Sequence, residues 1–251
     1  MKILLSPAKM LDETTPFPNI EYTNPMFKKQ TDELVKSVKK WKPSDFSKYM
    51  GISEKLAALN YERFQNWVSP EEKSDARRPA IFTFNGECYH GLDIHSLEKK
   101  HYAKLQENLR ILSGLYGMLL PFDWMYPYRL EMGTKADFSK KKSLYEFWGE
   151  TLINQLNQEE DKIIFNLASK EYFTAAKLAK AKAKVITPTF KEDKNGTLKT
   201  VMMYAKNQRG KFARFLIENP NWKIEEYKVY DQDGYLFNKA LSSENEWVFV
   251  R

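Results

Sequence analysis

The sequence predicts a mixed α/β (α+β) fold in which helices flank one mixed sheet. Short apolar runs of the length of buried strands recur at residues 3–5, 80–84, 109–112 and 162–167. Amphipathic segments with helical spacing lie between these runs. With 251 residues, of which 42% are hydrophobic, the chain is long enough to bury one substantial core. We therefore expect a single compact domain over residues 1–251, with two intimately packed lobes as the alternative.

The composition favours an anionic partner, but only moderately. The 40 Lys and Arg residues outnumber the 33 Asp and Glu residues, so the net charge is +7 and the pI is about 9.1. The single cysteine, Cys88, excludes an internal disulfide framework. The first apolar run is too short for a signal peptide, and no stretch approaches the length of a membrane span. We expect a cytoplasmic protein that does not contact a membrane.

The first predicted element is a buried strand at residues 3–5, which Ser6 and Pro7 end. Lys9 follows the end of this strand, where open α/β folds bind their ligands. Lys9 is therefore a candidate site residue, and a solvated surface lysine is the alternative. The next element is an amphipathic helix at residues 26–41.

Residues 44–67 predict two helices joined by a tight glycine turn. The first helix ends at Gly51, and Ser53 is a good N-cap for the second helix. In DNA-binding units of the helix–hairpin–helix type, backbone N–H groups of such a turn hold a phosphate at the start of the second helix. Gly51, Ser53 and Lys55 are therefore candidate DNA contacts. An ordinary helical hairpin that binds no phosphate is the alternative.

The three histidines lie close to the cysteine in the sequence. His90, His95, His101 and Cys88 would supply enough ligands for a zinc ion. Their spacing does not match a short-range zinc motif, and exposed histidines explain the pattern more simply. We expect no metal ion and no cofactor.

An apolar and irregular segment follows the strand predicted at residues 109–112. Gly114 and Gly117 open this segment, and the prolines at 121 and 127 prevent residues 113–133 from forming one long helix. Arg129 and Glu131 stand beside the aromatic residues of this segment. Such a charged pair must be solvated, mutually satisfied or part of a site. A covered crossover loop is the alternative to a segment that lines a site.

Polar residues also follow two other predicted strands. Asn85 ends the strand at residues 80–84, and Ser169 and Glu171 follow the strand at residues 162–167. Ser169 can also cap the helix that comes next. Because strand ends converge in α/β folds, we expect these residues to meet Lys9 and Glu131 in space.

The remaining elements are predicted from local patterns of apolar, turn and charged residues. They are a helix at 143–156, a helix ending in the basic stretch 177–184, a hairpin of strands 185–190 and 198–204, and strands near 226–230 and 246–250.

A strongly basic helix is predicted at residues 204–218. Lys206, Gly210 and Arg214 fall on one face of it, with Arg209 and Lys211 beside them. Cations near the start of a helix oppose its dipole, and a glycine inside a helix costs about 1 kcal/mol relative to alanine. A close approach of the helix to a phosphate would explain both features. We predict an anion-binding or nucleic-acid-binding surface here.

The chain resembles the bacterial YaaA family of peroxide-stress proteins. The motifs that carry the resemblance run from end to end: LLSPAKMLD, ISEKLAALNYERF, FNGECYHGL, LRILSGLYGMLLPFDWMYPYRLEMG, LYEFWG, NLASKEYF and YAKNQRGKFARFLIEN. The resemblance implies a role in limiting intracellular free iron and oxidative DNA damage during peroxide stress. It also implies a DNA-binding fold with a positively charged cleft and a helix–hairpin–helix element. Asn85 and Leu120 stand where the family has basic residues, so both departures remove positive charge.

Our first hypothesis is a protective DNA-binding protein without catalysis. The basic helix and the Gly51 hairpin would neutralise backbone phosphates with little sequence preference. Tyr128 or Tyr172 would stack on unpaired bases and favour distorted or bubble DNA over plain duplex.

Our second hypothesis is an enzyme that acts on nucleotides or damaged DNA. A lysine beside a carboxylate can act as a nucleophile or a base when it is buried. Both hypotheses stay open at this point, and an iron-binding protein ranks behind them because few ligands cluster. The candidate catalytic residues are Lys9, Asn85, Arg129, Glu131, Ser169 and Glu171.

Overall fold

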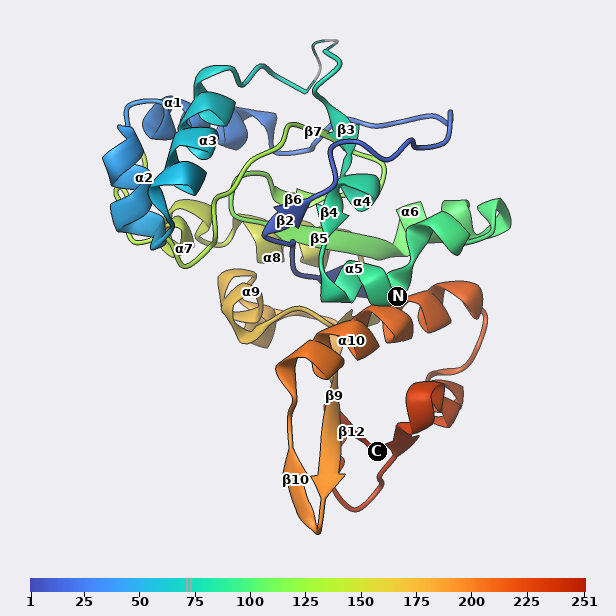
Figure 1. Cartoon of the computed structure of the whole chain (residues 1–251). Helices are drawn as coiled ribbons and strands as arrows, with labels where there is room; N and C mark the ends of the chain where they lie inside the picture. Colours follow the sequence, from blue (N-terminus) through green and yellow to red (C-terminus); the bar gives the residue numbers. More distant parts are fainter. Residues whose placement is uncertain (71, 73) are drawn as a thin grey trace.

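The computed structural model describes every residue except 71 and 73 and is built around an eight-stranded mixed sheet (Figure 1). Strands β5, β1, β8, β9 and β12 run parallel in that spatial order. Strands β6, β10 and β11 add to it as antiparallel neighbours of β5, β9 and β12. The prediction of a mixed α/β fold is therefore confirmed.

The strands of this sheet are β1 (Lys2–Leu5), β5 (Leu109–Ser113), β6 (Gly117–Leu119), β8 (Ile163–Asn166), β9 (Lys184–Lys194), β10 (Thr197–Lys199), β11 (Leu236–Phe237) and β12 (Glu246–Val250). Two small antiparallel pairs lie outside it: β2 (Met10–Leu11) with β4 (Phe84–Asn85), and β3 (Arg78–Pro79) with β7 (Trp124–Met125).

The α-helices are α1 (Lys28–Val38), α2 (Pro43–Met50), α3 (Glu54–Gln65), α4 (Ala80–Thr83), α5 (Glu87–Leu92), α6 (Tyr102–Asn108), α7 (Leu144–Trp148), α8 (Thr151–Gln158), α9 (Lys170–Ala175) and α10 (Met202–Glu218). Figure 1 shows α1, α2 and α3 gathered in the upper part of the molecule, whereas α10 and the β9–β10 hairpin form the lower part. No helix in the described part of the chain is long and apolar enough to cross a membrane.

The central strands β1 and β5 are buried along their whole length, and this explains their sequences. A strand of a parallel sheet is covered on both faces, so it shows a continuous apolar run instead of alternation. Ile3 pairs with Leu109 on one side and with Phe165 on the other, and all three side chains are buried. The predicted strands 3–5, 109–112 and 162–167 are confirmed.

The order of the strands creates a switch point between β1 and β8. The chain leaves β1, returns as β5 on one side of it, and later returns as β8 on its other side. Ligands of open α/β sheets bind outside the carboxyl ends of strands at such a point. Ser6 and Ser169 lie directly beyond these two strand ends.

The irregular segment after β5 is buried inside the protein. The indole Nε1–H of buried Trp148 donates a hydrogen bond to Gly114 O at 3.0 Å. A Cβ atom at Gly114 would lie 2.2 Å from Leu130 O, and one at Gly117 would lie 2.6 Å from the Trp148 ring. Both glycines are therefore required for packing rather than for contact with a ligand.

Two predicted helices are interrupted where a residue has a positive φ. The helix expected at 143–156 divides into α7 and α8 at Gly149, which has φ of 52°. The basic stretch 177–184 does not continue α9, because Lys177 has φ of 49°. A residue with positive φ cannot continue a right-handed helix, so each predicted helix was too long.

Three predicted strands are wrong in whole or in part. Residues 80–83 form the short helix α4, in which the Thr83 hydroxyl donates to Pro79 O at 2.7 Å. A short apolar run that is buried on all sides fits a strand or a helix equally well, so its periodicity did not distinguish the two. Residues 202–204 belong to α10, and the region predicted as a strand at 226–230 is a 3₁₀ helix at Ile224–Val229. The hairpin β9–β10 and strand β12 are confirmed.

The helical hairpin of the amino-terminal third is present as predicted. Gly51 ends α2 in the left-handed conformation with φ of 61°. The Ser53 hydroxyl then caps α3 by accepting the Leu56 N–H at 3.4 Å. Lys55 is exposed on the first turn of α3, and Figure 1 shows both helices well apart from α10.

Candidate functional site

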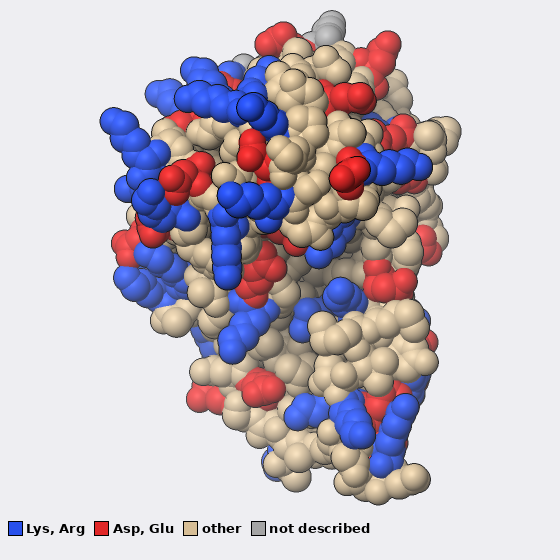
Figure 2. Space-filling model, turned by 60° about the vertical axis from the view of Figure 1, so that its left-hand side comes forward, with Lys and Arg blue, Asp and Glu red and all other residues tan. Residues whose placement is uncertain are grey.

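A pocket of about 470 Å³ opens beyond the carboxyl ends of β1 and β8. Residues of β2, β4, α5, α9, α10 and the segment after β7 complete its wall. Figure 2 shows a hollow between the upper and lower parts of the molecule, with basic and acidic side chains on its rim. The pocket therefore lies at the switch point of the sheet, where this architecture is expected to bind a ligand.

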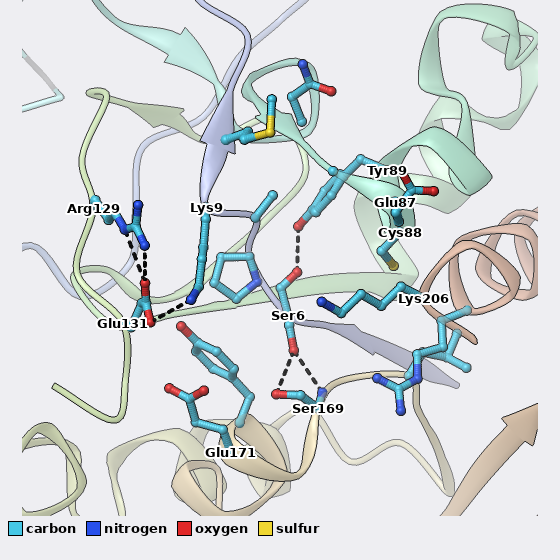
Figure 3. Close-up of a pocket in the computed structure, with 18 of the residues that line it drawn as sticks. Ser6, Lys9, Glu87, Cys88, Tyr89, Arg129, Glu131, Ser169, Glu171 and Lys206 are labelled. Carbon is cyan, nitrogen blue, oxygen red and sulfur yellow. Dashed lines mark hydrogen bonds and ion pairs between the residues drawn. The ribbon is translucent and has the colours of Figure 1, made fainter. Parts of the chain in front are cut away.

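The strand-end residues named by the second hypothesis meet in this pocket. They come from segments that are far apart in the sequence, and Figure 3 shows most of them converging from different elements. The residues that line the pocket from this set are Lys9, Asn85, Arg129, Glu131, Ser169 and Glu171.

Glu131 holds two cations at one end of the pocket. Lys9 Nζ lies 3.1 Å from Glu131 Oε2, and the Arg129 guanidinium donates to Oε1 from Nε at 3.1 Å and from Nη2 at 3.0 Å. The side chain of Lys9 is 64% exposed, whereas that of Arg129 is largely buried. Glu131 thus satisfies the buried guanidinium and also draws the exposed ammonium toward the pocket (Figure 3).

Two serines join the strand ends at the floor of the pocket. The Ser6 hydroxyl accepts the backbone N–H of Ser169 at 2.8 Å and donates to the Ser169 hydroxyl at 3.3 Å. The Tyr89 hydroxyl donates to Ser6 O at 2.9 Å, which ties α5 to the end of β1. These bonds hold both hydroxyls at fixed positions in the pocket.

Two cations of α10 enter the pocket without a partner. Among the described residues, neither Lys206 nor Arg209 has a hydrogen-bond or ion-pair partner for its charged group, although both line the pocket. Figure 3 shows the Lys206 side chain extending from α10 toward Ser6. Arg209 is half-buried, and this burial lowers the pKa of its guanidinium. An unpaired cation that is partly removed from water is poised to bind an anion.

The other two cations of α10 are used inside the protein. Lys211 Nζ donates to both carboxylate oxygens of Asp233, at 2.8 and 2.7 Å. The Arg214 guanidinium donates to the backbone oxygens of Leu92 and Asp93, at 3.2 and 2.8 Å, and to the Glu218 carboxylate at 2.8 Å. The basic face predicted on this helix is therefore divided into a free pair and an engaged pair.

Gly210 is buried against α5, so the phosphate contact predicted to explain this glycine is wrong. A Cβ atom at Gly210 would lie 1.7 Å from Cys88 O and 2.6 Å from Leu92 N. A Cβ atom at Gly91 would lie 2.0 Å from Asn207 O on α10. The two glycines allow α5 and α10 to pack with their backbones in contact, as the side-by-side helices in Figure 1 show.

Cys88 lines the pocket, but its thiol is not in a reactive environment. Burial raises the pKa of this thiol to about 12, although the nearby charges of Arg209 and Lys206 act in the opposite direction. The thiolate is the reactive form of cysteine. At neutral pH the Cys88 side chain is therefore a protonated, weakly polar part of the wall.

Tyrosine rings form the inner wall. Tyr128 and Tyr172 are each 5% exposed, and the Tyr128 hydroxyl shares a hydrogen bond of 2.5 Å with the Ser113 hydroxyl. Burial raises the pKa of both phenols, with smaller effects from neighbouring tyrosines and from Glu171 on Tyr172. Glu171 Oε1 accepts the Gly133 N–H at 2.7 Å, which ties α9 to the segment after β7. The rings are therefore neutral apolar surface for a ligand inside the pocket, and they are not exposed platforms.

The remaining candidates lie elsewhere or have other partners. The side chain of Asn85 contacts His90 Nε2 at 2.6 Å. The described residues contain no cluster of His, Cys, Asp and Glu side chains that could hold a metal ion. Gly51, Ser53 and Lys55 belong to the α2–α3 hairpin and do not line the pocket.

Several pocket residues were missed by sequence reasoning. Ser6 stands directly after the first strand, so the strand-end argument that selected Lys9 should have selected it as well. Tyr89, Met10 and Met202 had no such signal, because apolar and aromatic residues in helices and short strands are usually core.

Comparisons with known proteins cover the whole chain. A family model described as peroxide stress protein YaaA matches residues 1–241. A UPF0246 protein of Aliivibrio fischeri strain MJ11 is 46% identical over 255 residues, which span 100% of this chain and 98% of that protein. UPF0246 proteins of Saccharophagus degradans and Flavobacterium johnsoniae are each 45% identical, over 100% of this chain and 99% and 100% of their own lengths.

Proposed function

The chain belongs to the peroxide stress protein YaaA family, and from this premise we propose that it binds DNA during the response to hydrogen peroxide. In this proposal the protein protects DNA and limits intracellular free iron. It holds backbone phosphates in a basic cleft and has little sequence preference. Distorted or bubble DNA is the preferred form, because its unpaired bases are accessible.

One observation carries the proposal: Lys206 and Arg209 enter the pocket with no partner among the described residues. A protein that used these cations only for folding would pair them, as it pairs Lys211 and Arg214 on the same helix. Phosphate oxygens are the anions that such a pair is suited to bind. The Gly51–Ser53 turn with exposed Lys55 is the second proposed contact, in the upper part of the molecule.

The proposal is tested by fluorescence anisotropy with labelled duplex and bubble DNA at low and at physiological salt. We expect the Lys206→Gln/Arg209→Gln variant to bind at least about tenfold more weakly than the natural protein. The slope of log affinity against log salt is negative, and each lost phosphate contact makes it shallower by about 0.9, so its magnitude should fall by about 2. The loss should be equal for unrelated sequences, because phosphates carry no sequence information.

A matched control removes two positive charges far from the pocket. Lys194 and Lys199 are exposed on the β9–β10 hairpin, so the Lys194→Gln/Lys199→Gln variant has the same net charge as the pocket variant. It should bind DNA as the natural protein does. Equal loss in both variants, or weak binding that salt does not change, would contradict a specific role for Lys206 and Arg209.

A second function, an enzyme on nucleotides or damaged DNA, is favoured by the convergence of strand-end residues around Lys9 and Glu131. An amine that lies 3.1 Å from a carboxylate inside a ligand-sized pocket is a plausible base or nucleophile. The Lys9 side chain is 64% exposed, however, whereas a lysine serves as a base or nucleophile when it is buried. This function therefore ranks second.

The enzyme hypothesis predicts a product that depends on Lys9. The natural protein and a Lys9→Met variant would be incubated with nucleotides and with oxidised oligonucleotides, and the products separated by chromatography and denaturing gels. A product formed by the natural protein and reduced at least about a hundredfold in the variant would support catalysis. Unchanged substrates with both proteins would exclude it.

A further inference from the structure

We propose that the pocket binds one nucleoside 5′-monophosphate unit, with its phosphate on Lys206, Arg209 and the Ser169 hydroxyl. The unit is either a free nucleotide or a nucleotide extruded from DNA, and these two sources share the same chemistry. The inference deepens the DNA-binding proposal and rests on it only for the second source.

The phosphate end of the pocket is set by two cations one helical turn apart. Lys206 and Arg209 stand at positions i and i+3 of α10, so their side chains share a face. Arg209 is half-buried without a partner, and leaving a guanidinium in this state is unfavourable until an anion binds. A phosphate group accepts several hydrogen bonds at once and therefore fits a guanidinium and an ammonium together.

The serines at the strand ends complete this end of the pocket. Ser6 Oγ already accepts the Ser169 N–H at 2.8 Å, and its own proton is directed to the Ser169 hydroxyl at 3.3 Å. The Ser169 hydroxyl proton is then available to a ligand. Figure 3 shows Lys206 pointing toward these serines, so the neutral donor and the cation face the same space.

The tyrosine wall of the pocket suits a ring. Tyr128 and Tyr172 present buried ring surfaces, and Pro7, Leu130 and Leu167 continue the apolar wall. Base–aromatic contacts are favourable and tolerate any base, because every base has a π-face. A flat base with a phosphate attached matches an apolar wall that ends at two cations.

Three carboxylates line the pocket, and each has a partner within the protein. Glu87 Oε1 lies 3.4 Å from His90 Nδ1. Glu131 is neutralised by Lys9 and Arg129, and Glu171 accepts the Gly133 N–H. Their remaining lone pairs can accept N–H groups of a base, which is how proteins read an extruded base.

The size of the pocket limits the ligand to a single unit. A volume of about 470 Å³ falls in the range of small-molecule sites, which is roughly 300–1,000 Å³. A DNA duplex cannot enter it, so DNA could reach Tyr172 only by presenting one unpaired nucleotide. The unit would lie at the β1–β8 switch point, as nucleotides do in other open α/β sheets.

Two exposed methionines at the pocket support the DNA source of this unit. Met10 is 67% exposed and Met202 is 58% exposed, although both are large apolar side chains. Proteins that unstack DNA often insert an apolar side chain, methionine included, between base steps. Met10 and Met202 are placed to fill the space that an extruded base leaves.

The chemistry of the pocket is tested by isothermal titration calorimetry with the four deoxynucleoside 5′-monophosphates, the matching nucleosides and inorganic phosphate. We expect each monophosphate to bind at least about tenfold more tightly than its nucleoside, a difference of about 1.4 kcal/mol. Arg209→Gln should abolish this difference. Lys206→Gln, a change at an exposed residue that does not disturb the fold, should reduce it. Lys194→Gln/Lys199→Gln should leave it unchanged.

Three results would overturn the inference. The first is no binding of any monophosphate at millimolar concentration. The second is equal affinity for monophosphate and nucleoside, and the third is equal affinity of the natural protein and both pocket variants. If inorganic phosphate bound as tightly as the monophosphates, the site would be a plain anion site and the proposed base contact would be wrong.

A second experiment distinguishes a free nucleotide from a nucleotide extruded from DNA. Anisotropy would compare a duplex carrying one unpaired nucleotide with the same duplex fully paired, with deoxyadenosine 5′-monophosphate as competitor. Two results together would assign the pocket to extruded nucleotides. The monophosphate should compete with the duplex that carries the unpaired nucleotide and not with the fully paired duplex. The protein should also bind the first duplex more tightly than the second, and the Met10→Ser/Met202→Ser variant should lose this preference. Monophosphate binding without any DNA binding would reject the DNA proposal and keep the inference for a free nucleotide. DNA binding without monophosphate binding would keep the DNA proposal and reject the inference.

Discussion

Replacing Gly210 by alanine is expected to destabilise the protein by about 3 kcal/mol or to prevent it from folding. Helix propensity alone predicts the opposite, a gain of about 1 kcal/mol for a glycine in the interior of a helix. Sterics decides the sign here, because the new Cβ atom would lie 1.7 Å from Cys88 O and 2.6 Å from Leu92 N. These are backbone atoms of α5, so no side chain can rotate away and the two helices must separate.

Urea denaturation of the Gly210→Ala protein measures this cost. Gly51→Ala is the matched control, since a Cβ atom at Gly51 would meet nothing within 4 Å, although its backbone has φ of 61°. The control should lose only about 1–2 kcal/mol, which is the cost of a left-handed alanine. A Gly210→Ala protein as stable as the natural one would show that α5 and α10 are not in backbone contact.

Separation of α5 and α10 would also change the shape of the pocket, because both helices line it. Lys206 and Arg209 lie on the same helix as Gly210, and Cys88 of α5 forms part of the wall beside them. Any folded Gly210→Ala protein is therefore expected to bind phosphate ligands more weakly than the natural protein. Gly210 does not line the pocket itself. It affects the site by setting the position of α10, which carries Lys206 and Arg209.

The second large effect is expected at Arg110, where a change to methionine should cost about 3 kcal/mol. Arg110 Nε donates to Glu159 Oε1 at 3.2 Å, and Nη2 lies 3.1 Å from Oε2. Nη1 donates to three backbone oxygens at 2.8–3.2 Å. Both side chains are nearly inaccessible, with 8% and 11% exposure. Among the described residues, the substitution leaves the buried carboxylate with Lys2 as its remaining ion-pair partner, at 3.5 Å.

A double-mutant cycle tests whether the buried pair or its packing matters. Arg110→Met and Glu159→Met should each be strongly destabilising, whereas the double variant should cost clearly less than their sum. Strict additivity would show that the two charges do not interact. The pair lies at the amino end of β5, away from the pocket at the carboxyl ends of β1 and β8, so nucleotide binding should be unchanged in the folded variants.

Local signals predicted a large part of the fold. The buried strands 3–5, 109–112 and 162–167, the Ser53 cap and the β9–β10 hairpin depend on short-range chemistry, and all of them are present. The prediction failed at residues 80–83, where burial on all sides hides the periodicity, and at Gly149 and Lys177, where a residue with positive φ ends a helix. The strand ends also predicted that Lys9 and Glu131 would meet, because topology brings such ends together.

The sequence by itself determined the family, the strands of the central sheet and the set of residues from which a site could be built. Those properties follow from motifs, periodicity and strand ends, all of which are local. Only the tertiary structure decided which of the four cations of α10 are free. Lys211 and Arg214 find partners on other elements, whereas Lys206 and Arg209 find none among the described residues. The pairing of a charge depends on what packs against it, and segments distant in the chain supply that neighbourhood only after folding.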